Sequence, residues 1–310
     1  MIAFVFPGQG AQVVGMGKDF YENSELSKNI FDEAAELLDF DVKKVCFEEN
    51  EAINITEYTQ AAMLTTSVAM LEVLKEKGLK PDVCAGLSLG EYCALVASGV
   101  MDFEDALKAV RQRGILMQEA VPTGIGAMSA IIGLDADVIA GICDKIDEVS
   151  VANYNCPGQI VITGKKEAVE KANEELKEAG ARRCVMLNVS GPFHSEMLKT
   201  AGEELYRVLE NVELKDFEIP YVTNVTAKYV TNENKNEIKE MLKDQVSSSV
   251  LWIQSVENMI EQGVDTFVEI GPGKTLTGFI KKIAKAVDKE VTTYNVEKYE
   301  DVEAVVNALA

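Results

Sequence analysis

The first hundred residues alternate between short apolar runs and longer stretches in which apolar residues recur at helical spacing. Residues 2–6 and 83–86 are apolar runs of strand length, and the first ends at a Pro-Gly pair. Residues 24–38 and 59–77 have helical periodicity, and another helical run follows the second strand through Ala97. Strands that alternate with helices predict an α/β fold with a mostly parallel sheet.

A different order of elements is predicted in the middle of the chain. The pattern gives strand, helix, strand, strand, helix and strand at residues 127–132, 135–146, 149–153, 160–163, 165–179 and 182–187. This is the split βαβ order of a ferredoxin-like unit. Because the pattern begins and ends within the chain, we expect residues 125–189 to form an inserted ferredoxin-like subdomain. The larger domain is then built from residues 1–124 and 190–310.

The larger domain is predicted to resume with a helix at 195–209 and a strand at 220–223. Residues 231–236 are polar throughout, so we expect a disordered tip there. Two more helices follow, and then a strand at 266–270 that ends at a Gly-Pro-Gly turn.

The charge balance narrows the possible partners. Among 310 residues, 30 are Lys or Arg and 51 are Asp or Glu, which gives a net charge of −21. This argues against nucleic acid, whose phosphates attract clustered basic residues. The most basic stretch is interpreted as a solvated helix face; it contains Lys274, Lys281, Lys282 and Lys285. No apolar run approaches the roughly 20 residues of a membrane span, so we expect a soluble protein.

Neither a metal nor a cofactor is expected. The six cysteines are scattered without a C-x-x-C pair, which argues against zinc and disulfides and favours a reducing cytoplasm. Two glycine loops look like nucleotide sites but fail on spacing. The third glycine of a dinucleotide loop would fall at Val13, and the first glycine of a P-loop would fall at Val268.

Ser88 lies at the centre of a G-x-S-x-G motif formed by residues 86–90, between a predicted strand and a predicted helix. In such an elbow the sharp turn exposes the serine, and the glycines remove side chains that would clash. The N-terminus of the following helix stabilises an oxyanion. An ordinary Gly/Ser turn is the plainer alternative, but the flanking elements favour a nucleophile.

His194 is the one histidine of the chain. A serine hydroxyl is a weak nucleophile and needs a base within hydrogen-bond reach, so the choice of base is forced. A lone histidine is more often structural, yet this one stands between a Gly-Pro-Phe loop and the helix predicted at 195–209. We expect the helix N-terminus to keep the imidazole neutral and able to accept a proton.

Arg113 lies on the same face as apolar residues of the helix predicted at 104–119. A guanidinium in an apolar stripe needs a partner, and two alternatives are open. One is an internal salt bridge, and the other is a substrate carboxylate held by two parallel hydrogen bonds. Lys108 and Arg111 lie off this face, so we expect both to be solvated.

Taken together, the motifs resemble the malonyl-CoA:acyl-carrier-protein transacylases of fatty acid synthesis and the acyltransferase domains of polyketide synthases. The matching segments, in the family's order along nearly the whole chain, are Phe6-Pro7-Gly8-Gln9-Gly10, Gly86-x-Ser88-Leu89-Gly90-Glu91-Tyr92, Arg113-Gly114, Met117-Gln118-Glu119-Ala120-Val121-Pro122, Gly126-Ala127-Met128, Asn155-x-Pro157-Gly158-Gln159, Phe193-His194 and Glu269-x-Gly271-Pro272-Gly273.

The resemblance implies an α/β-hydrolase-like core with a ferredoxin-like subdomain, and an enzyme that moves malonyl groups from malonyl-CoA to acyl carrier protein. It implies that Ser88 is the nucleophile and His194 its base. It also implies that Arg113 clamps the malonyl carboxylate. The main-chain carbonyl of Gln245 matches the position that orients the histidine in this family.

The resemblance further implies that the backbone N–H groups of Gln9 and Leu89 form the oxyanion hole. Leu89 after the serine and Phe193 before the histidine are similar to the malonyl-selective members. One departure is Leu87, where the family usually has a histidine. We expect this change to alter local packing or substrate entry and to leave catalysis in place.

Three alternatives remain at this point. A free-standing acyltransferase for a polyketide synthase would share the chemistry and differ in its carrier. A serine esterase or thioesterase would share the elbow, but usually orients its histidine with Asp or Glu. A catalytically silent docking subunit would need neither an intact Ser88 nor an intact His194.

Overall fold

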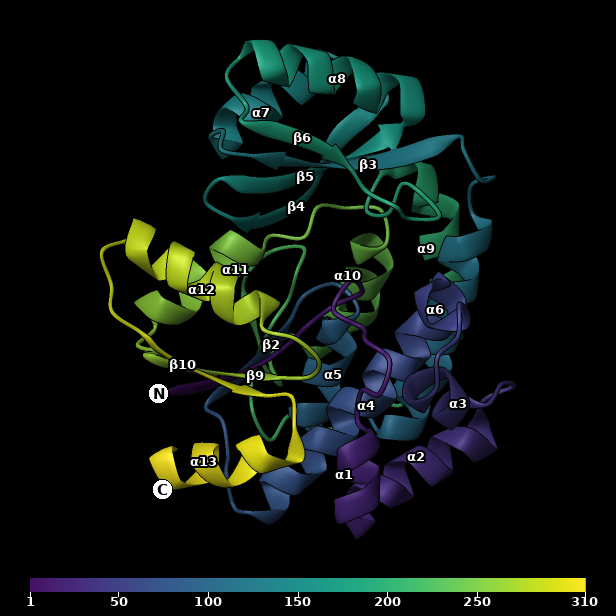
Figure 1. Ribbon diagram of the computed structural model, residues 1–310, viewed down its shortest axis with the longest axis vertical. Helices are drawn as coiled ribbons and strands as arrows, with labels where there is room; N and C mark the ends of the chain where they lie inside the picture. The colour runs from purple at the N-terminus through teal and green to yellow at the C-terminus, as the bar shows by residue number, and fades with distance from the viewer. Residues whose placement is uncertain (310) are drawn as a thin grey trace.

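A computed structural model describes residues 1–309 of the protein, which form two sheets and the helices around them (Figure 1). The strands are β1 (Ile2–Phe6), β2 (Val83–Gly86), β3 (Gly126–Ile132), β4 (Val149–Cys156), β5 (Gln159–Lys165), β6 (Arg183–Met186), β7 (Tyr221–Val222), β8 (Tyr229–Val230), β9 (Thr266–Ile270) and β10 (Thr292–Val296). The larger sheet has the order β10-β9-β1-β2-β7-β8, and the smaller has the order β4-β5-β3-β6.

Helices surround both sheets. They are α1 (Lys18–Asn23), α2 (Glu25–Leu37), α3 (Val42–Phe47), α4 (Thr56–Glu76), α5 (Gly90–Ala97), α6 (Phe103–Glu119), α7 (Ala136–Cys143), α8 (Lys166–Glu178), α9 (Lys199–Leu209), α10 (Ile238–Gln245), α11 (Trp252–Glu261), α12 (Thr275–Ala286) and α13 (Tyr299–Leu309), with short 3-10 helices η1 (Ala52–Asn54), η2 (Glu196–Leu198) and η3 (Lys235–Glu237). None of the helices within residues 1–309 has the length and apolar character needed to cross a membrane.

The central strands β1 and β2 of the larger sheet are buried on both faces, which explains why they are continuous apolar runs. On β1, Phe4 and Phe6 point into a core shared with α4 and α5, whereas Ala3 and Val5 point into a second core shared with α11 and α12. All neighbouring strands in this sheet are parallel except β7 and β8. The predicted α/β class with a mostly parallel sheet is confirmed.

The smaller sheet lies beyond the larger one, at the top of Figure 1, with α7 and α8 on its outer face. Its antiparallel order places the first and third of its strands in the centre, as a ferredoxin-like unit requires. Two main-chain hydrogen bonds join it to the core: Tyr154 N–H donates to the Val250 carbonyl (2.9 Å), and Val250 N–H donates to the Ala152 carbonyl (2.8 Å).

The prediction of a disordered tip at residues 231–236 is wrong. Asn234 Oδ1 accepts a hydrogen bond from Thr231 N–H (2.8 Å), and Asn232 Oδ1 accepts one from Phe217 N–H (2.8 Å). These asparagine side chains satisfy backbone donors in place of a strand or helix, and the segment leads into η3. The polar composition of residues 231–236 therefore indicates an ordered turn.

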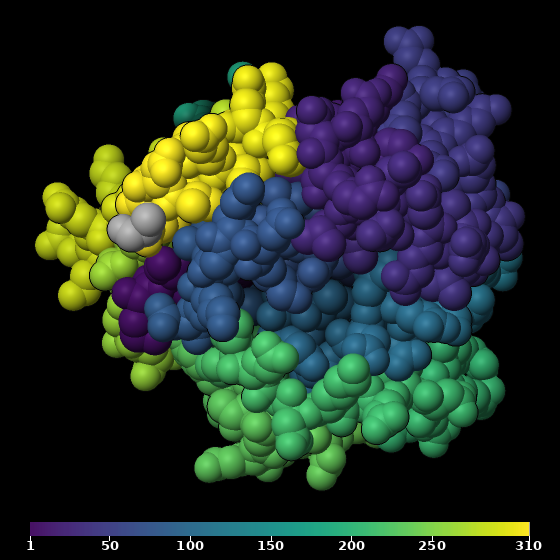
Figure 2. Space-filling view, turned by 90° about the horizontal axis from the view of Figure 1, so that it is seen from below, coloured from purple at the N-terminus to yellow at the C-terminus, as the bar shows by residue number. Residues whose placement is uncertain are grey.

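Several elements at the edges of the fold were not predicted, namely α1, α3, β8, β10 and α13. Helix α13 lies beside the N-terminal region on the face shown in Figure 2. Its Tyr299 ring packs edge-on against Phe20 at 5.5 Å between centroids, and Tyr299 N–H donates to Asp19 Oδ2 (2.7 Å). These contacts connect the two ends of the described chain.

The basic stretch before and along α12 is exposed, as expected for a solvated helix face. Its four lysines, Lys274, Lys281, Lys282 and Lys285, all lie at the surface. The helix covers the sheet with its opposite side, through Ile280 and Ile283.

The elbow between β2 and α5 accepts only glycine at position 86. A Cβ added to Gly86 would overlap the main chain of Gly90 and Glu91 one turn later. We expect Gly86→Ala to lower the free energy of unfolding by about 3 kcal/mol, because no flexible side chain is available to move aside. Urea unfolding measures this loss.

Gly278→Ala is the matched control, since a Cβ at this position in α12 meets no atom within 4 Å. It is expected to raise the free energy of unfolding by up to about 1 kcal/mol through helix propensity. A Gly86→Ala protein as stable as the wild type would contradict the close packing of the elbow.

Candidate active site

Two loops leave the same edge of the larger sheet and meet there. Strands β1 and β2 are parallel neighbours with Phe6 opposite Gly86, so the loops that follow them emerge side by side. The loop after β1 contains Gln9, and the loop after β2 contains Ser88 and turns directly into α5. The structure thus places Ser88 at the predicted strand-to-helix elbow, and its side chain is partly exposed.

Ser88 and His194 lie next to each other although 106 positions separate them. Ser88 Oγ is 2.8 Å from His194 Nε2, and His194 Nδ1 is 2.8 Å from the main-chain oxygen of Gln245. Because a carbonyl oxygen only accepts hydrogen bonds, Nδ1 carries the proton. Nε2 is then left to accept the proton of the serine hydroxyl.

The backbone is strained at both residues. Ser88 has φ 54° and His194 has φ 60°, in the left-handed region that non-glycine residues rarely adopt. Each such position costs on the order of 1–3 kcal/mol and persists only where the surrounding structure imposes it. In this backbone conformation the Ser88 and His194 side chains point toward each other, with Oγ 2.8 Å from Nε2.

Burial keeps the His194 imidazole neutral. The side chain is 4% exposed, and burial, followed by the charge of Arg113, lowers the pKa of His194 to about 4. The predicted neutrality agrees with this direction, and the causes that lower the pKa are burial and Arg113. The predicted helix begins two residues after His194, as the 3-10 helix η2 that continues directly into α9.

Arg113 is buried beside Ser88 and is 1% exposed. Its guanidinium donates to Gln60 Oε1 (2.6 Å), Gln245 Oε1 (2.9 Å) and Ser88 Oγ (3.1 Å). Within residues 1–309, no carboxylate forms an ion pair with Arg113, and its Nε has no hydrogen-bond partner. The internal salt bridge is therefore not formed, and the groups that accept hydrogen bonds from Arg113 are all neutral.

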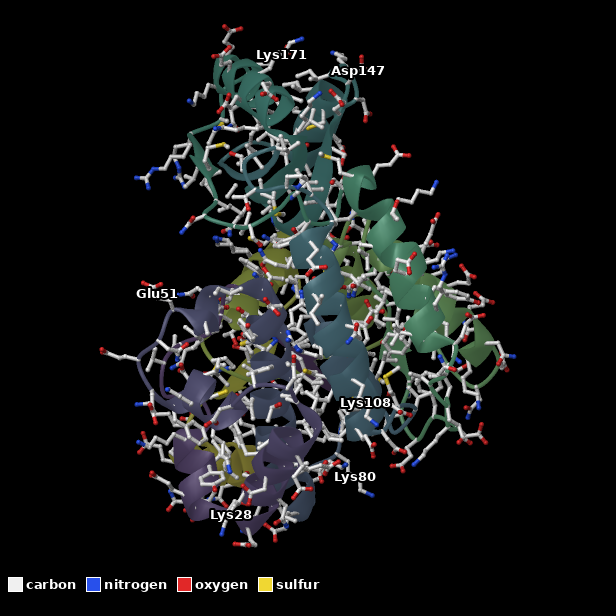
Figure 3. The ribbon with its side chains drawn as sticks, turned by 90° about the vertical axis from the view of Figure 1, so that its right-hand side faces the viewer. Lys28, Glu51, Lys80, Lys108, Asp147 and Lys171 are labelled. Carbon is white, nitrogen blue, oxygen red and sulfur yellow. The ribbon has the colours of Figure 1, made fainter. Side chains whose placement is uncertain are left out.

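Arg111 is the arginine of α6 that forms ion pairs, and its predicted solvation is wrong. It is 8% exposed and contacts Asp39 (Nε to Oδ1, 2.7 Å) and Glu57 (Nη1 to Oε2, 2.9 Å). This side of α6 packs against the N-terminal helices, so a position off the apolar stripe is still covered. Lys108 does reach solvent, near the lower end of α6 in Figure 3.

Two backbone donors near Ser88 are free. In the described part of the chain, no atom accepts a hydrogen bond from the N–H of Gln9 or of Leu89. The N–H of Ser88 itself is bonded to Asn224 Oδ1 (2.6 Å). An oxygen that develops negative charge beside Ser88 therefore has Gln9 and Leu89 as available donors.

Three polar residues around these groups were given no role in the prediction, namely Gln60, Asn224 and Glu91, although Glu91 belongs to a matched segment. All are at most 1% exposed. Burial raises the pKa of the Glu91 carboxyl to about 7, against the effect of a hydrogen bond from Gln245. An acidic residue inside the apolar helical run 90–97 was the available sequence signal, because a buried carboxylate needs partners.

No metal-binding group is apparent in the part of the chain that the structure describes, where no three or more His, Cys, Asp or Glu side chains cluster suitably. The two glycine loops that look like nucleotide sites in the sequence follow β1 and β9. The first leads into another loop, and the second leads into α12.

The sequence matches the acyl transferase domain family over residues 3–304. A malonyl CoA-acyl carrier protein transacylase of Bacillus subtilis (strain 168) is 48% identical over 313 residues, covering 99% of this chain and 97% of the relative. A transacylase of the same description from Clostridium perfringens has a solved structure with a TM-score of 0.94 and 44% identity, covering 99% of this chain and 96% of that one.

A second solved structure is described as a type II PKS acyl-carrier protein in complex with its malonyl-transacylase. The matched chain has a TM-score of 0.94 and 41% identity, with 99% of both chains covered. At these identities the likeness extends beyond the fold.

The low pKa of His194 makes a prediction about the reactivity of Ser88. Protonation removes the acceptor at Nε2, so sulfonylation of Ser88 by a sulfonyl fluoride should slow only as the pH falls toward about 4. The rate, followed by intact mass, should be nearly constant between about pH 5.5 and 7, where a free imidazole would titrate. Ser88→Ala is the control for labelling elsewhere. A midpoint near pH 6.5 would contradict the burial argument.

Proposed function

The chain belongs to the acyl transferase family of malonyl-CoA:acyl-carrier-protein transacylases, and on that premise we propose that it carries a malonyl group on Ser88. The donor is malonyl-CoA, and the acceptor is the phosphopantetheine thiol of an acyl carrier protein. The observation that carries the proposal is the buried Arg113, 3.1 Å from Ser88 Oγ, whose hydrogen-bond acceptors within residues 1–309 are all neutral. An acyl group that ends in a carboxylate supplies the missing anion.

In the first half-reaction, Ser88 Oγ attacks the thioester carbonyl while His194 Nε2 takes its proton. The carbonyl oxygen becomes an oxyanion, held by the N–H groups of Gln9 and Leu89. One such donor typically lowers the barrier by roughly 3 kcal/mol. The carbon–sulfur bond then breaks, and coenzyme A leaves as a thiol with the proton from His194.

In the second half-reaction, the thiol of the carrier protein gives its proton to His194 and attacks the malonyl ester. The same donors hold the oxyanion, the ester bond breaks, and Ser88 Oγ regains its proton from His194. Both residues return to their starting state. Every bond and proton is accounted for without a metal or a redox cofactor, so the proposal includes neither.

Arg113 determines which acyl group is accepted. Nε is without a partner within residues 1–309 and shares one edge of the guanidinium with Nη2, so the two oxygens of a carboxylate can bind this edge in place of the contact from Nη2 to Ser88 Oγ. An acetyl group leaves the buried guanidinium without this partner. The loss of a charged hydrogen bond is worth about 1.5–3 kcal/mol, which favours malonyl over acetyl.

The esterase alternative is disfavoured by the partner of His194. Its Nδ1 faces the main-chain carbonyl of Gln245 at 2.8 Å, where esterases usually place a carboxylate. We therefore assign the orienting role to Gln245. The contact between Ser88 and His194 disfavours a silent subunit.

Transfer to a polyketide carrier requires the same chemistry, and one relative is described with such a carrier. We propose fatty acid synthesis as the pathway and the cytoplasm as the location, where the free cysteines stay reduced. We also propose that residues 125–189 form the inserted subdomain and residues 1–124 and 190–310 the catalytic domain. All strands of the smaller sheet lie within the insert.

The covalent step predicts a mass change. Mixing the protein with malonyl-CoA should give a malonyl adduct in the intact mass spectrum, and Ser88→Ala should abolish it. Adding carrier protein in its phosphopantetheine form should discharge the adduct to the carrier. Rapid release of free malonate would instead support an esterase, and the absence of any adduct would support a silent subunit.

The clamp predicts a change in substrate preference. Arg113→Ala should lower kcat/KM for malonyl-CoA by about two orders of magnitude, because the charged hydrogen bonds are lost. Acetyl transfer should be spared or improved. Arg111→Ala is the matched control, since this neighbour pairs with Asp39 and Glu57 away from Ser88. It should lower stability and leave the malonyl-to-acetyl ratio unchanged. Equal losses for both substrates in Arg113→Ala would refute the clamp.

A further inference from the structure

A buried carboxylate lies behind the nucleophile. Glu91 is in the first turn of α5, three positions after Ser88, and is 0% exposed. Its Oε2 accepts hydrogen bonds from Gln245 Nε2 (2.8 Å) and from Asn224 N–H (3.2 Å). The proposed transfer cycle does not use this group.

Gln245 connects Glu91 to the rest of the site. Its Nε2 donates to the Ser88 carbonyl (2.9 Å) as well as to Glu91, and its Oε1 accepts from Arg113 Nη2 (2.9 Å). The two ends of the amide are not interchangeable here. If the amide turned over, its NH₂ group would face the guanidinium donors and its oxygen would face two acceptor oxygens.

Asn224 makes a second connection. Its Oδ1 accepts from Ser88 N–H (2.6 Å), and its Nδ2 donates to the Gly86 carbonyl (2.6 Å). The asparagine side chain therefore bridges both sides of the elbow, and its own backbone N–H is bonded to Glu91. Glu91 Oε2 thus contacts both Asn224, which holds the elbow, and Gln245, which holds the guanidinium of Arg113.

We infer that Glu91 is a positioning residue for malonyl transfer, because its carboxylate holds the Gln245 amide in the orientation that presents Oε1 to Arg113. The inference rests on the proposed function, in which Arg113 binds the malonyl carboxylate. Without Glu91, one N–H of Gln245 is left without an acceptor in a buried site, and one of the two acceptor oxygens that oppose a turned amide is lost. The guanidinium then loses its fixed position relative to Ser88.

The role requires an acceptor oxygen and does not require a charge. Burial raises the pKa of Glu91 to about 7, so both protonation states are present near neutral pH. Oε2 keeps a lone pair for the Gln245 donor when a proton resides on Oε1. A glutamine at this position can supply the same oxygen.

The test compares Glu91→Leu and Glu91→Gln by kcat/KM for malonyl-CoA and for acetyl-CoA. Glu91→Leu should lower the malonyl value by about tenfold more than the acetyl value, since the lost positioning affects the carboxylate clamp. Glu91→Gln should restore the malonyl-to-acetyl ratio of the wild type. Equal losses for both substrates in Glu91→Leu, or no recovery in Glu91→Gln, would overturn the inference.

Glu269→Leu is the matched control. Glu269 is also 0% exposed, and its carboxylate accepts from Leu276 N–H (3.0 Å) and Thr277 N–H (2.7 Å) at the start of α12. Its loss should lower stability without changing the ratio of the two substrates. A changed ratio would show that any buried carboxylate moves this readout, and would count against Glu91 as a specific positioning residue.

Two further variants keep the test decisive. If Glu91→Leu does not fold, Glu91→Asp withdraws the carboxylate by roughly one C–C bond, about 1.5 Å, and should change the ratio in the same direction. An unchanged ratio there would overturn the inference. In an Arg113→Ala background, the Glu91 substitution should change the ratio no further, and an added change would also overturn it.

The two proposals fail separately. If Arg113→Ala leaves the ratio unchanged, the clamp itself is refuted. If Arg113→Ala changes the ratio and the Glu91 variants do not, only the role of Glu91 is refuted.

Discussion

Arg113 brings a positive charge into a site where, among residues 1–309, its acceptors are two glutamine amides and a serine hydroxyl. Two positions earlier on the same helix, Arg111 has two carboxylates and contacts no reacting group. The uncompensated charge has three consequences. It helps to lower the pKa of His194, it favours negative charge on Ser88 Oγ, and in the proposed function it is paired by the carboxylate of the acyl group.

Amides are suited to hold such a guanidinium because they fix its plane without neutralising it. A carboxylate in place of Gln60 or Gln245 would form an ion pair before any substrate arrived, and a malonyl group would then have to displace it. Glu91 is placed one hydrogen bond further away, against the far end of the Gln245 amide. Its carboxylate therefore makes no direct hydrogen bond to Arg113, and in the inferred role it acts on the guanidinium through the orientation of the Gln245 amide.

Much of this arrangement was predictable because local patterns encode it. The elbow at Ser88 followed from a strand, two glycines and a helix, and a single histidine left one choice of base. Periodicity placed Arg113 correctly, but it failed for Arg111 because it says nothing about which helix covers a polar face. Gln60, Glu91 and Asn224 were missed, since their importance lies in contacts between distant segments, such as the bond from Asn224 to Ser88. The ordered turn at residues 231–236 was missed because asparagine side chains, and not apolar spacing, determine it.

A transferase must also deliver its ester to a thiol and not to water, and the buried histidine bears on this choice. With a pKa near 4, His194 is a weak base. Water has a pKa of about 15.7, so a weak base assists its attack poorly, whereas a thiol with a pKa of about 8.5 loses its proton far more readily. Attack by a thiol therefore depends less than attack by water on the strength of this base. The same burial leaves Arg113 without solvent, so in the proposed cycle one dry environment acts on both the acyl group that enters and the thiol that removes it.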